Sequence, residues 1–112
     1  MAPPRIIVDL SDLKLYLLEG NTIIRQFPVA IGRMVTQTPR GEYHIINKQV
    51  NPGGPFGVLW MGLSKPHYGI HGTNDPSSIG HMVSHGCIRM YNDDVLALSK
   101  LAPVGTQVTI RS

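Results

Sequence analysis

Glycine and proline interrupt this chain so often that long helices are excluded from most of it. Its 112 residues include 12 glycines and 9 prolines, and both residue types destabilise the interior of a helix. Between these interruptions lie short runs in which apolar and polar residues alternate, which is the pattern of half-buried strands. The sequence therefore predicts a mostly β fold, with two mixed sheets packed or curled together and one short helix in the C-terminal half.

The alternation is clear in the first third of the chain. Residues 5–10 read as a strand, and Leu13, Leu15 and Leu17 begin a second one after a turn at residues 11–12. A hairpin connection at residues 19–21 leads to a third strand at residues 22–31. The apolar face of that third strand is expected to contain Ile23, Phe27, Val29 and Ile31. Arg25 interrupts this face, which places the strand at an edge of the sheet.

Later strands are expected at residues 43–46, 58–63, 68–71 and 107–111. Residues 51–57 separate two of them with two prolines and three glycines. Such a segment cannot form regular structure, because proline lacks a backbone donor and glycine resists ordering. We expect this segment to be a loop that borders a site.

One helix is predicted to begin near Asn92. This residue is a favourable N-cap, and Asp93 and Asp94 follow where the helix dipole favours anions. The expected buried face consists of Val95, Leu98 and Leu101. Pro103 and Gly105 end the helix.

Length and charge limit the classes of function. A chain of 112 residues supports one core, so a single domain spanning residues 1–112 is expected. The formal charge is +3, with Lys and Arg scattered singly from Arg5 to Arg111, which argues against a nucleic acid partner. No apolar run approaches the ~20 residues of a membrane span. Residues 1–4 lead straight into strand-like sequence, so neither an anchor nor an export signal is expected.

The only cysteine lies in a polar stretch, Ser84-His85-Gly86-Cys87-Ile88-Arg89-Met90. A thiol needs a base to act as a nucleophile at neutral pH, and His71, sixteen positions earlier, is the expected partner. A nearby imidazolium would lower the pKa of the thiol. The backbone N–H groups of residues 85–87 could converge on an oxyanion, because Gly86 permits an unusual backbone conformation.

Two other interpretations use the same residues. A lone cysteine is often a small buried apolar residue, although its polar flanks would then need partners. A zinc site could also draw on imidazole and thiolate ligands, with His71, His81, His85 and Cys87 as candidates. The sequence has no C-x-x-C or H-E-x-x-H motif, which disfavours a metal site. His44 and His67 are interpreted as surface or packing residues.

The segment His71-Gly72-Thr73-Asn74, followed by Ser84-His85-Gly86-Cys87-Ile88-Arg89-Met90, resembles the active-site signature of the YkuD-type L,D-transpeptidases. In that family a histidine precedes, at a similar distance, a Ser/Thr-His-Gly-Cys run. The resemblance implies a YkuD-like fold and extends over most of the chain. It includes the opening strand pair, the turn at residues 38–41, the loop at residues 51–57 and the helix after the cysteine.

The resemblance also implies the roles of individual residues. Cys87 would be the nucleophile and His71 its base, with the backbone carbonyl of Gly72 orienting the ring through Nδ1. His85 and Gly86 would complete the catalytic turn. Substrate contacts would come from Ser84 and Arg89. The family pattern is often written with Asn at the position of Arg89, where arginine resembles a common variant, and this departure leaves its donor contacts open. As an alternative, Arg89 could form an ion pair with Asp93 or Asp94 that fixes the turn.

The implied reaction is acyl transfer on peptidoglycan stem peptides. Cys87 would attack the carbonyl of the third residue of a tetrapeptide donor and release D-Ala, and a diamino acid amine would resolve the thioester as a 3-3 cross-link. Water as acceptor would make the protein an L,D-carboxypeptidase, and a third alternative is a non-catalytic module that binds the cell wall. No metal or organic cofactor is expected. The substrate implies the cell envelope, and carbapenems would acylate Cys87.

Overall fold

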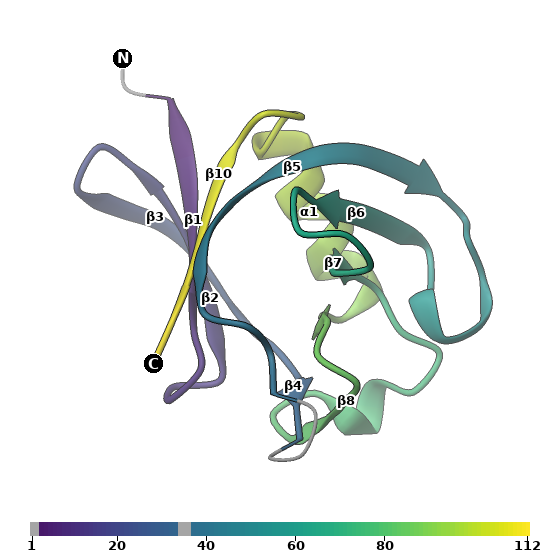
Figure 1. The fold of residues 1–112 in the computed structure, drawn as a ribbon. Helices are drawn as coiled ribbons and strands as arrows, with labels where there is room; N and C mark the ends of the chain where they lie inside the picture. Colours follow the sequence, from purple (N-terminus) through teal and green to yellow (C-terminus); the bar gives the residue numbers. More distant parts are fainter. Residues whose placement is uncertain (1–2, 34–36) are drawn as a thin grey trace.

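The computed structural model describes residues 3–33 and 37–112. Its elements, shown in Figure 1, are ten strands, one α-helix and two short 3-10 helices within these residues. In chain order they are β1 (Pro4–Asp9), β2 (Lys14–Glu19), β3 (Thr22–Pro28), β4 (Ile31–Gly32), β5 (Gly41–Val50), η2 (Gly54–Phe56), β6 (Leu59–Leu63), β7 (Gly69–His71), η3 (Pro76–Ser78), β8 (Met82–Ser84), β9 (Ile88–Arg89), α1 (Asn92–Leu101) and β10 (Gln107–Arg111).

Eight strands form one mixed sheet in the order β3-β2-β1-β10-β5-β6-β7-β9, and β4 pairs with β8 in a second, small sheet. The β1–β10 and β7–β9 pairs are parallel. The long strand β5 joins the two halves of the large sheet, and its pairing with β6 shifts register between Ile45 and Asn47. Such irregularities increase strand bending and twist, and Figure 1 shows β5 curving from one half to the other. The mostly β fold class is confirmed.

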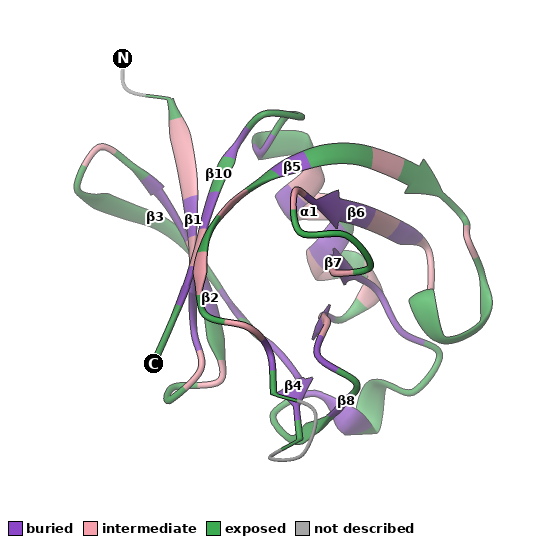
Figure 2. Cartoon of the chain, in the orientation of Figure 1, coloured by how far each residue is buried: buried purple, intermediate pink, exposed green. Residues whose placement is uncertain are grey.

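One cluster of buried apolar residues lies between these elements. It draws on β1, β2, β6, β7 and β10 and on Val95 and Leu98 of α1. Figure 2 shows the resulting contrast between the largely buried β6 and β7 and the exposed β3. The expected face of the third strand is wrong at Ile23, which is 55% exposed. The register of β3 on β2 shifts between Leu17 and Leu18, so one end of β3 turns to solvent.

The helix begins and ends close to its predicted limits, but two of its residues differ from expectation. Tyr91 is the N-cap and provides no side-chain capping bond, whereas Asn92 is the first helical residue. Leu101 is 40% exposed, although Val95 and Leu98 are fully buried as predicted. The helix therefore packs on β6 and β7 with a narrower apolar face than the sequence indicated.

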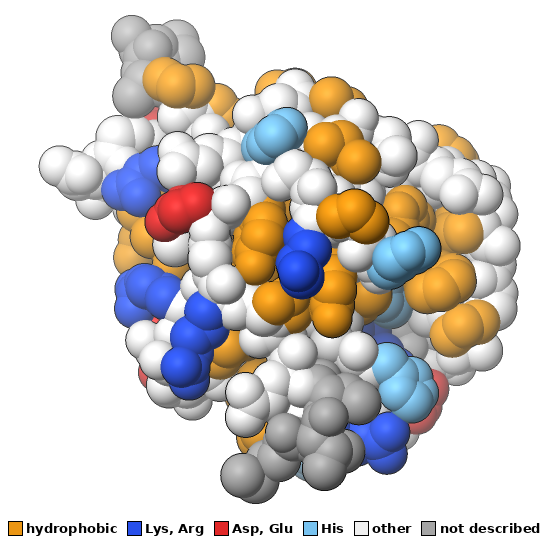
Figure 3. Space-filling view, in the orientation of Figure 1, with side chains coloured by type: hydrophobic (Ala, Val, Ile, Leu, Met, Phe, Trp, Pro, Cys, Tyr) orange, Lys and Arg blue, Asp and Glu red, His pale blue; other side chains and the backbone are white. Residues whose placement is uncertain are grey.

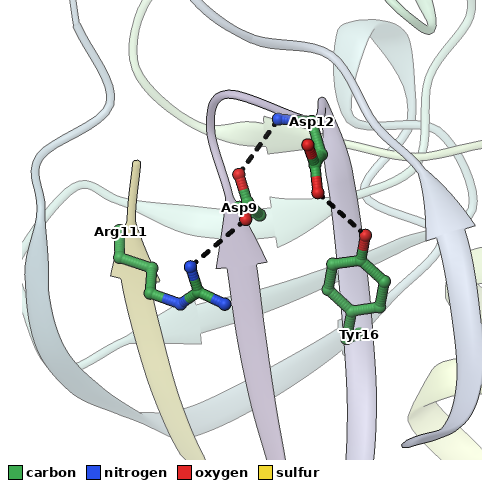
Figure 4. A network of polar contacts seen from close by, with 4 residues as sticks. All are labelled: Asp9, Asp12, Tyr16 and Arg111. Carbon is green, nitrogen blue, oxygen red and sulfur yellow. Dashed lines mark hydrogen bonds and ion pairs between the residues drawn. The ribbon is translucent and has the colours of Figure 1, made fainter.

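Polar contacts fix the ends of the strands at the start of the chain. The carboxylate of Asp9 pairs with Arg111 at 3.2 Å and accepts the backbone N–H of Asp12 at 3.0 Å. The Tyr16 hydroxyl donates to the Asp12 carboxylate at 3.1 Å, as Figure 4 shows. Together these contacts hold the β1–β2 turn against β10.

The face in Figure 3 carries apolar side chains at the surface, interspersed with basic and histidine side chains.

Candidate active site

The pairing of β7 with β9 brings the two halves of the Cys–His motif together. Ile70 lies opposite Ile88, and His71 lies opposite Arg89. Both isoleucines are fully buried in the core. Successive strand residues point to opposite faces, so His71 and Arg89 face away from the core. Cys87 directly precedes β9 and shares the face of Arg89.

These side chains line a pocket of about 300 Å³. Its lining consists of Pro55, Phe56, Trp60, His67, His71, Ser84, His85, Cys87 and Arg89. The segment at residues 51–57 does border the site, since two of its residues lie in the wall. The prediction that it forms no regular structure is wrong at Gly54–Phe56, which form the 3-10 helix η2. Residues more than thirty positions apart in the sequence thus share one cavity.

Three aromatic rings make one side of this pocket. Trp60 stacks on His71 with 5.5 Å between ring centroids and 15° between ring planes. Phe56 meets both rings edge-on, at 5.1 Å in each case. Trp60 and His71 are register partners on β6 and β7, so strand pairing itself creates the stack. This cover leaves His71 only 3% exposed.

The His71 ring is held by a backbone carbonyl. Its Nδ1 lies 2.5 Å from the carbonyl oxygen of Gly72, and that oxygen can only accept, so Nδ1 carries the proton. The other nitrogen, Nε2, is then free to accept a proton. Burial lowers the pKa of His71 to about 4; the Gly72 bond opposes this effect and the charge of Arg89 adds to it. At neutral pH the imidazole is uncharged.

The Cys87 thiol is half-buried in the same pocket. Its Sγ donates to the carbonyl of His67 at 3.7 Å, and no hydrogen bond joins it to His71 among the described residues. Burial raises its pKa, against the opposing effects of the Gly69 N–H and the Arg89 charge. The expected lowering of the thiol pKa by an imidazolium is therefore wrong for this state, in which both groups are neutral.

The turn from Ser84 to Cys87 is closed by its own serine. The Ser84 hydroxyl accepts the Gly86 N–H at 3.1 Å and donates to the Cys87 carbonyl at 2.7 Å. Gly86 has φ +123°, and a Cβ there would lie 2.7 Å from the ring of Tyr68, so only glycine fits. The Gly86 N–H is occupied, whereas the N–H groups of His85 and Cys87 have no acceptor among residues 3–33 and 37–112.

Arg89 is held in the pocket without a carboxylate partner. Its backbone pairs with Ala30 in both directions, at 2.8 and 2.9 Å, while its buried Nε has no hydrogen-bond partner. The alternative of an ion pair with Asp93 or Asp94 is not found within the part of the chain that is described. A buried donor left unpaired costs stability.

The other histidines lie at the surface. His44, His67, His81 and His85 are exposed. Of the candidate zinc ligands, His71, His85 and Cys87 line the pocket and His81 does not. No group of three or more side chains that could hold a metal ion is present in the described ranges. In the same ranges, no helix is long and apolar enough to cross a membrane.

Sequence reasoning missed three contributors to this pocket. Trp60, Phe56 and the carbonyl of His67 line or contact it. The period-two pattern of residues 58–63 could have indicated that Trp60 faces away from its core neighbours Leu59 and Met61. The pairing of Trp60 with His71 depends on register, and the role of His67 depends on a backbone atom, so neither has a sequence signal.

Comparisons with known proteins identify the family of this chain. A family model described as the YkuD L,D-transpeptidase catalytic domain matches residues 3–110. A Bacillus licheniformis protein named as a candidate L,D-transpeptidase, YkuD, is 57% identical over 96% of this chain. The chain spans 66% of the length of that relative, just under two thirds.

Two solved structures share the fold. The catalytic domain of an E. faecium L,D-transpeptidase has a TM-score of 0.82 and 24% identity, and the match covers 98% of both chains. The L,D-transpeptidase LdtMt1, solved in complex with imipenem, has a TM-score of 0.81 and 18% identity, over 96% of this chain and 58% of that one. Because the family model covers nearly all of the sequence, this chain belongs to the YkuD family of L,D-transpeptidase catalytic domains.

Proposed function

We propose that residues 1–112 are one catalytic domain that performs L,D-transpeptidation on peptidoglycan stem peptides through Cys87 and His71. Family membership supports the reaction class. The observation that carries the residue roles is the shared pocket, in which a neutral thiol faces the same space as an imidazole whose Nδ1 is committed to Gly72. No metal or organic cofactor takes part.

The first half-reaction begins with two uncharged groups. As a tetrapeptide donor fills the pocket, it displaces the thiol from the His67 carbonyl, and the thiol proton passes to Nε2 of His71. The sulfur attacks the carbonyl of the third stem residue, an L-configured diamino acid. The tetrahedral intermediate then collapses, His71 returns the proton to the leaving amine, and D-Ala departs. A thioester on Cys87 remains.

Backbone donors receive the charge of the intermediate. The N–H groups of His85 and Cys87 are the available oxyanion donors, while Ser84 and Gly86 shape the turn that presents them. Arg89 binds a carboxylate of the donor peptide, because the residue lines the pocket and has no carboxylate partner among the described residues.

The second half-reaction transfers the acyl group. The side-chain amine of a second stem peptide attacks the thioester, its proton passes to His71, and the sulfur leaves and takes the proton back. The product is a 3-3 cross-link. With water as acceptor the same steps give an L,D-carboxypeptidase. Because stem peptides lie outside the cytoplasmic membrane, the working location is the cell envelope.

Incubation with a disaccharide tetrapeptide, followed by mass spectrometry of the products, tests this function. A cross-linked dimer with release of D-Ala is the expected result, and a Cys87→Ala variant should give neither. Trimmed tripeptide without dimer would assign carboxypeptidase activity instead. Tetrapeptide that is bound but unchanged would leave a wall-binding module and overturn the proposal, as would D-Ala release by the Cys87→Ala variant.

A further inference from the structure

Asn92 makes a set of contacts that helix capping does not explain. Its Oδ1 accepts the backbone N–H groups of Thr73 at 3.0 Å and Val58 at 3.3 Å. Its Nδ2 donates to the carbonyl of Thr73 at 3.0 Å. The amide orientation is fixed by its partners, because two donors require the oxygen and one acceptor requires the nitrogen. Asn92 therefore holds two loops rather than its own helix.

One of those bonds reaches the same peptide group that orients His71. The N–H of Thr73 and the C=O of Gly72 belong to one planar unit, and in a trans peptide they point in opposite directions. The N–H end donates to Asn92 and the C=O end accepts from Nδ1 of His71. We propose that Asn92 is a positioning residue, which sets the tautomer and orientation of His71 by holding the Gly72–Thr73 peptide.

The close fit around Asn92 supports this role. A Cβ at either Gly57 or Gly72 would collide with Oδ1 of Asn92, so the amide oxygen occupies a notch that only two glycines can form. The backbone N–H of Gly72 is also bonded, to the Leu59 carbonyl at 3.0 Å. With its neighbours fixed in this way, the Gly72–Thr73 peptide has little freedom to rotate, and bonds at its two ends polarise each other.

The contact with Val58 extends the same control to the aromatic wall. Val58 follows the 3-10 helix η2, which contains Phe56, and Phe56 meets the His71 ring edge-on. Asn92 thus supports both contacts that define the position of His71: the hydrogen bond to the Gly72 carbonyl and the ring contact with Phe56. The expected effect on activity rests on the proposed role of His71. The expected effect on the tautomer does not, because the tautomer can be measured without substrate.

Nitrogen-15 NMR of the imidazole in the free protein provides the test. Wild type should show His71 protonated at Nδ1. Asn92→Ala should shift the His71 ring toward protonation at Nε2. It should also lower kcat about tenfold, which is the effect of losing one hydrogen bond, here that between Nδ1 of His71 and the Gly72 carbonyl, with KM little changed. Asn92→Asp retains an oxygen acceptor for both N–H groups, although its second oxygen faces the Thr73 carbonyl in place of the Nδ2 donor. Because the Thr73 N–H remains held, this variant should keep the Nδ1 tautomer. Asn74→Ala, in an exposed part of the same loop, is the matched control and should resemble wild type.

An Asn92→Ala protein that is folded and keeps the Nδ1 tautomer would overturn the inference. So would an Asn92→Asp protein whose tautomer shifts. If Asn92→Ala does not fold, as judged by its amide spectrum, Asn92→Asp decides the matter alone. A shifted tautomer with no activity in any variant, wild type included, would support this inference and count against the proposed function.

Discussion

The imidazole of His71 and the indole of Trp60 lie stacked, with ring centroids 5.5 Å apart. The contact follows from the pairing of β7 with β6, in which these two residues are opposite each other. It buries the imidazole, and burial is the main cause of a His71 pKa near 4. Burial beneath an aromatic neighbour therefore keeps the proposed base uncharged.

Removing the indole should move the acid limb of the pH–activity profile. In wild type, kcat/KM should fall only as the pH approaches 4, because the base must be neutral. Trp60→Ala admits water and should return the pKa toward 6.5, at which an imidazole is only ~3% neutral at pH 5. Phe56→Ala removes an edge contact of a ring that is 39% exposed and should shift the limb less. If wild type and Trp60→Ala gave the same dependence of kcat/KM on pH between pH 4 and 8, the role of burial would be contradicted.

The same pKa shift predicts how stability depends on pH. His71 titrates lower in the folded state than the ordinary 6.5 of an unfolded chain, so the unfolded state binds the proton first and acid destabilises the fold. Between pH 7 and pH 4, wild type should lose ~3 kcal/mol more unfolding free energy than His71→Gln, which does not titrate. Urea unfolding at several pH values measures this difference. A constant difference between the two proteins would show that His71 is not responsible.

Replacing Arg89 should separate function from stability. Arg89→Met keeps an unbranched apolar stem and removes a buried donor that has no partner, so the free energy of unfolding should not decrease. The loss of a charged hydrogen bond to the donor peptide should lower kcat/KM by about tenfold or more. Lys100→Ala removes an exposed positive charge elsewhere and serves as the control. Unchanged kcat/KM, or a destabilised Arg89→Met protein, would argue for a structural role.

A carbapenem should form one covalent adduct with the protein, on Cys87. Cys87 lines the pocket, and the proposed function makes its thiol the nucleophile that a carbapenem would acylate. Intact-mass spectrometry after incubation with imipenem should show a single addition to wild type and none to Cys87→Ala. His71→Gln should react much more slowly, since it lacks the base. Absence of an adduct on folded wild type would disagree with a nucleophilic Cys87.

Much of the fold could be read from the sequence because the signals are local. Alternation identified β1, β2, β3, β5, β6, β7 and β10 but not the short strands β4, β8 and β9, and Asp93 and Asp94 marked the first turn of the helix. Ile23 and Leu101 were misplaced because tertiary packing, including the register shift between β2 and β3, decides which face is covered. Asn92 was misread as a cap because its real partners, Thr73 and Val58, are distant in sequence.

For the site, the sequence by itself determined which reactive groups are present and where the backbone can take an unusual conformation. A thiol, an imidazole and a glycine are each provided by the residue type at one position. Only the tertiary structure decided their states. The pKa values of His71 and Cys87 move because burial removes water, and burial depends on which strands pair. The Cys87 thiol donates to the carbonyl of His67, twenty positions away, and Arg89 lacks a carboxylate partner among the described residues. Such outcomes arise from distances between segments, which no local pattern encodes.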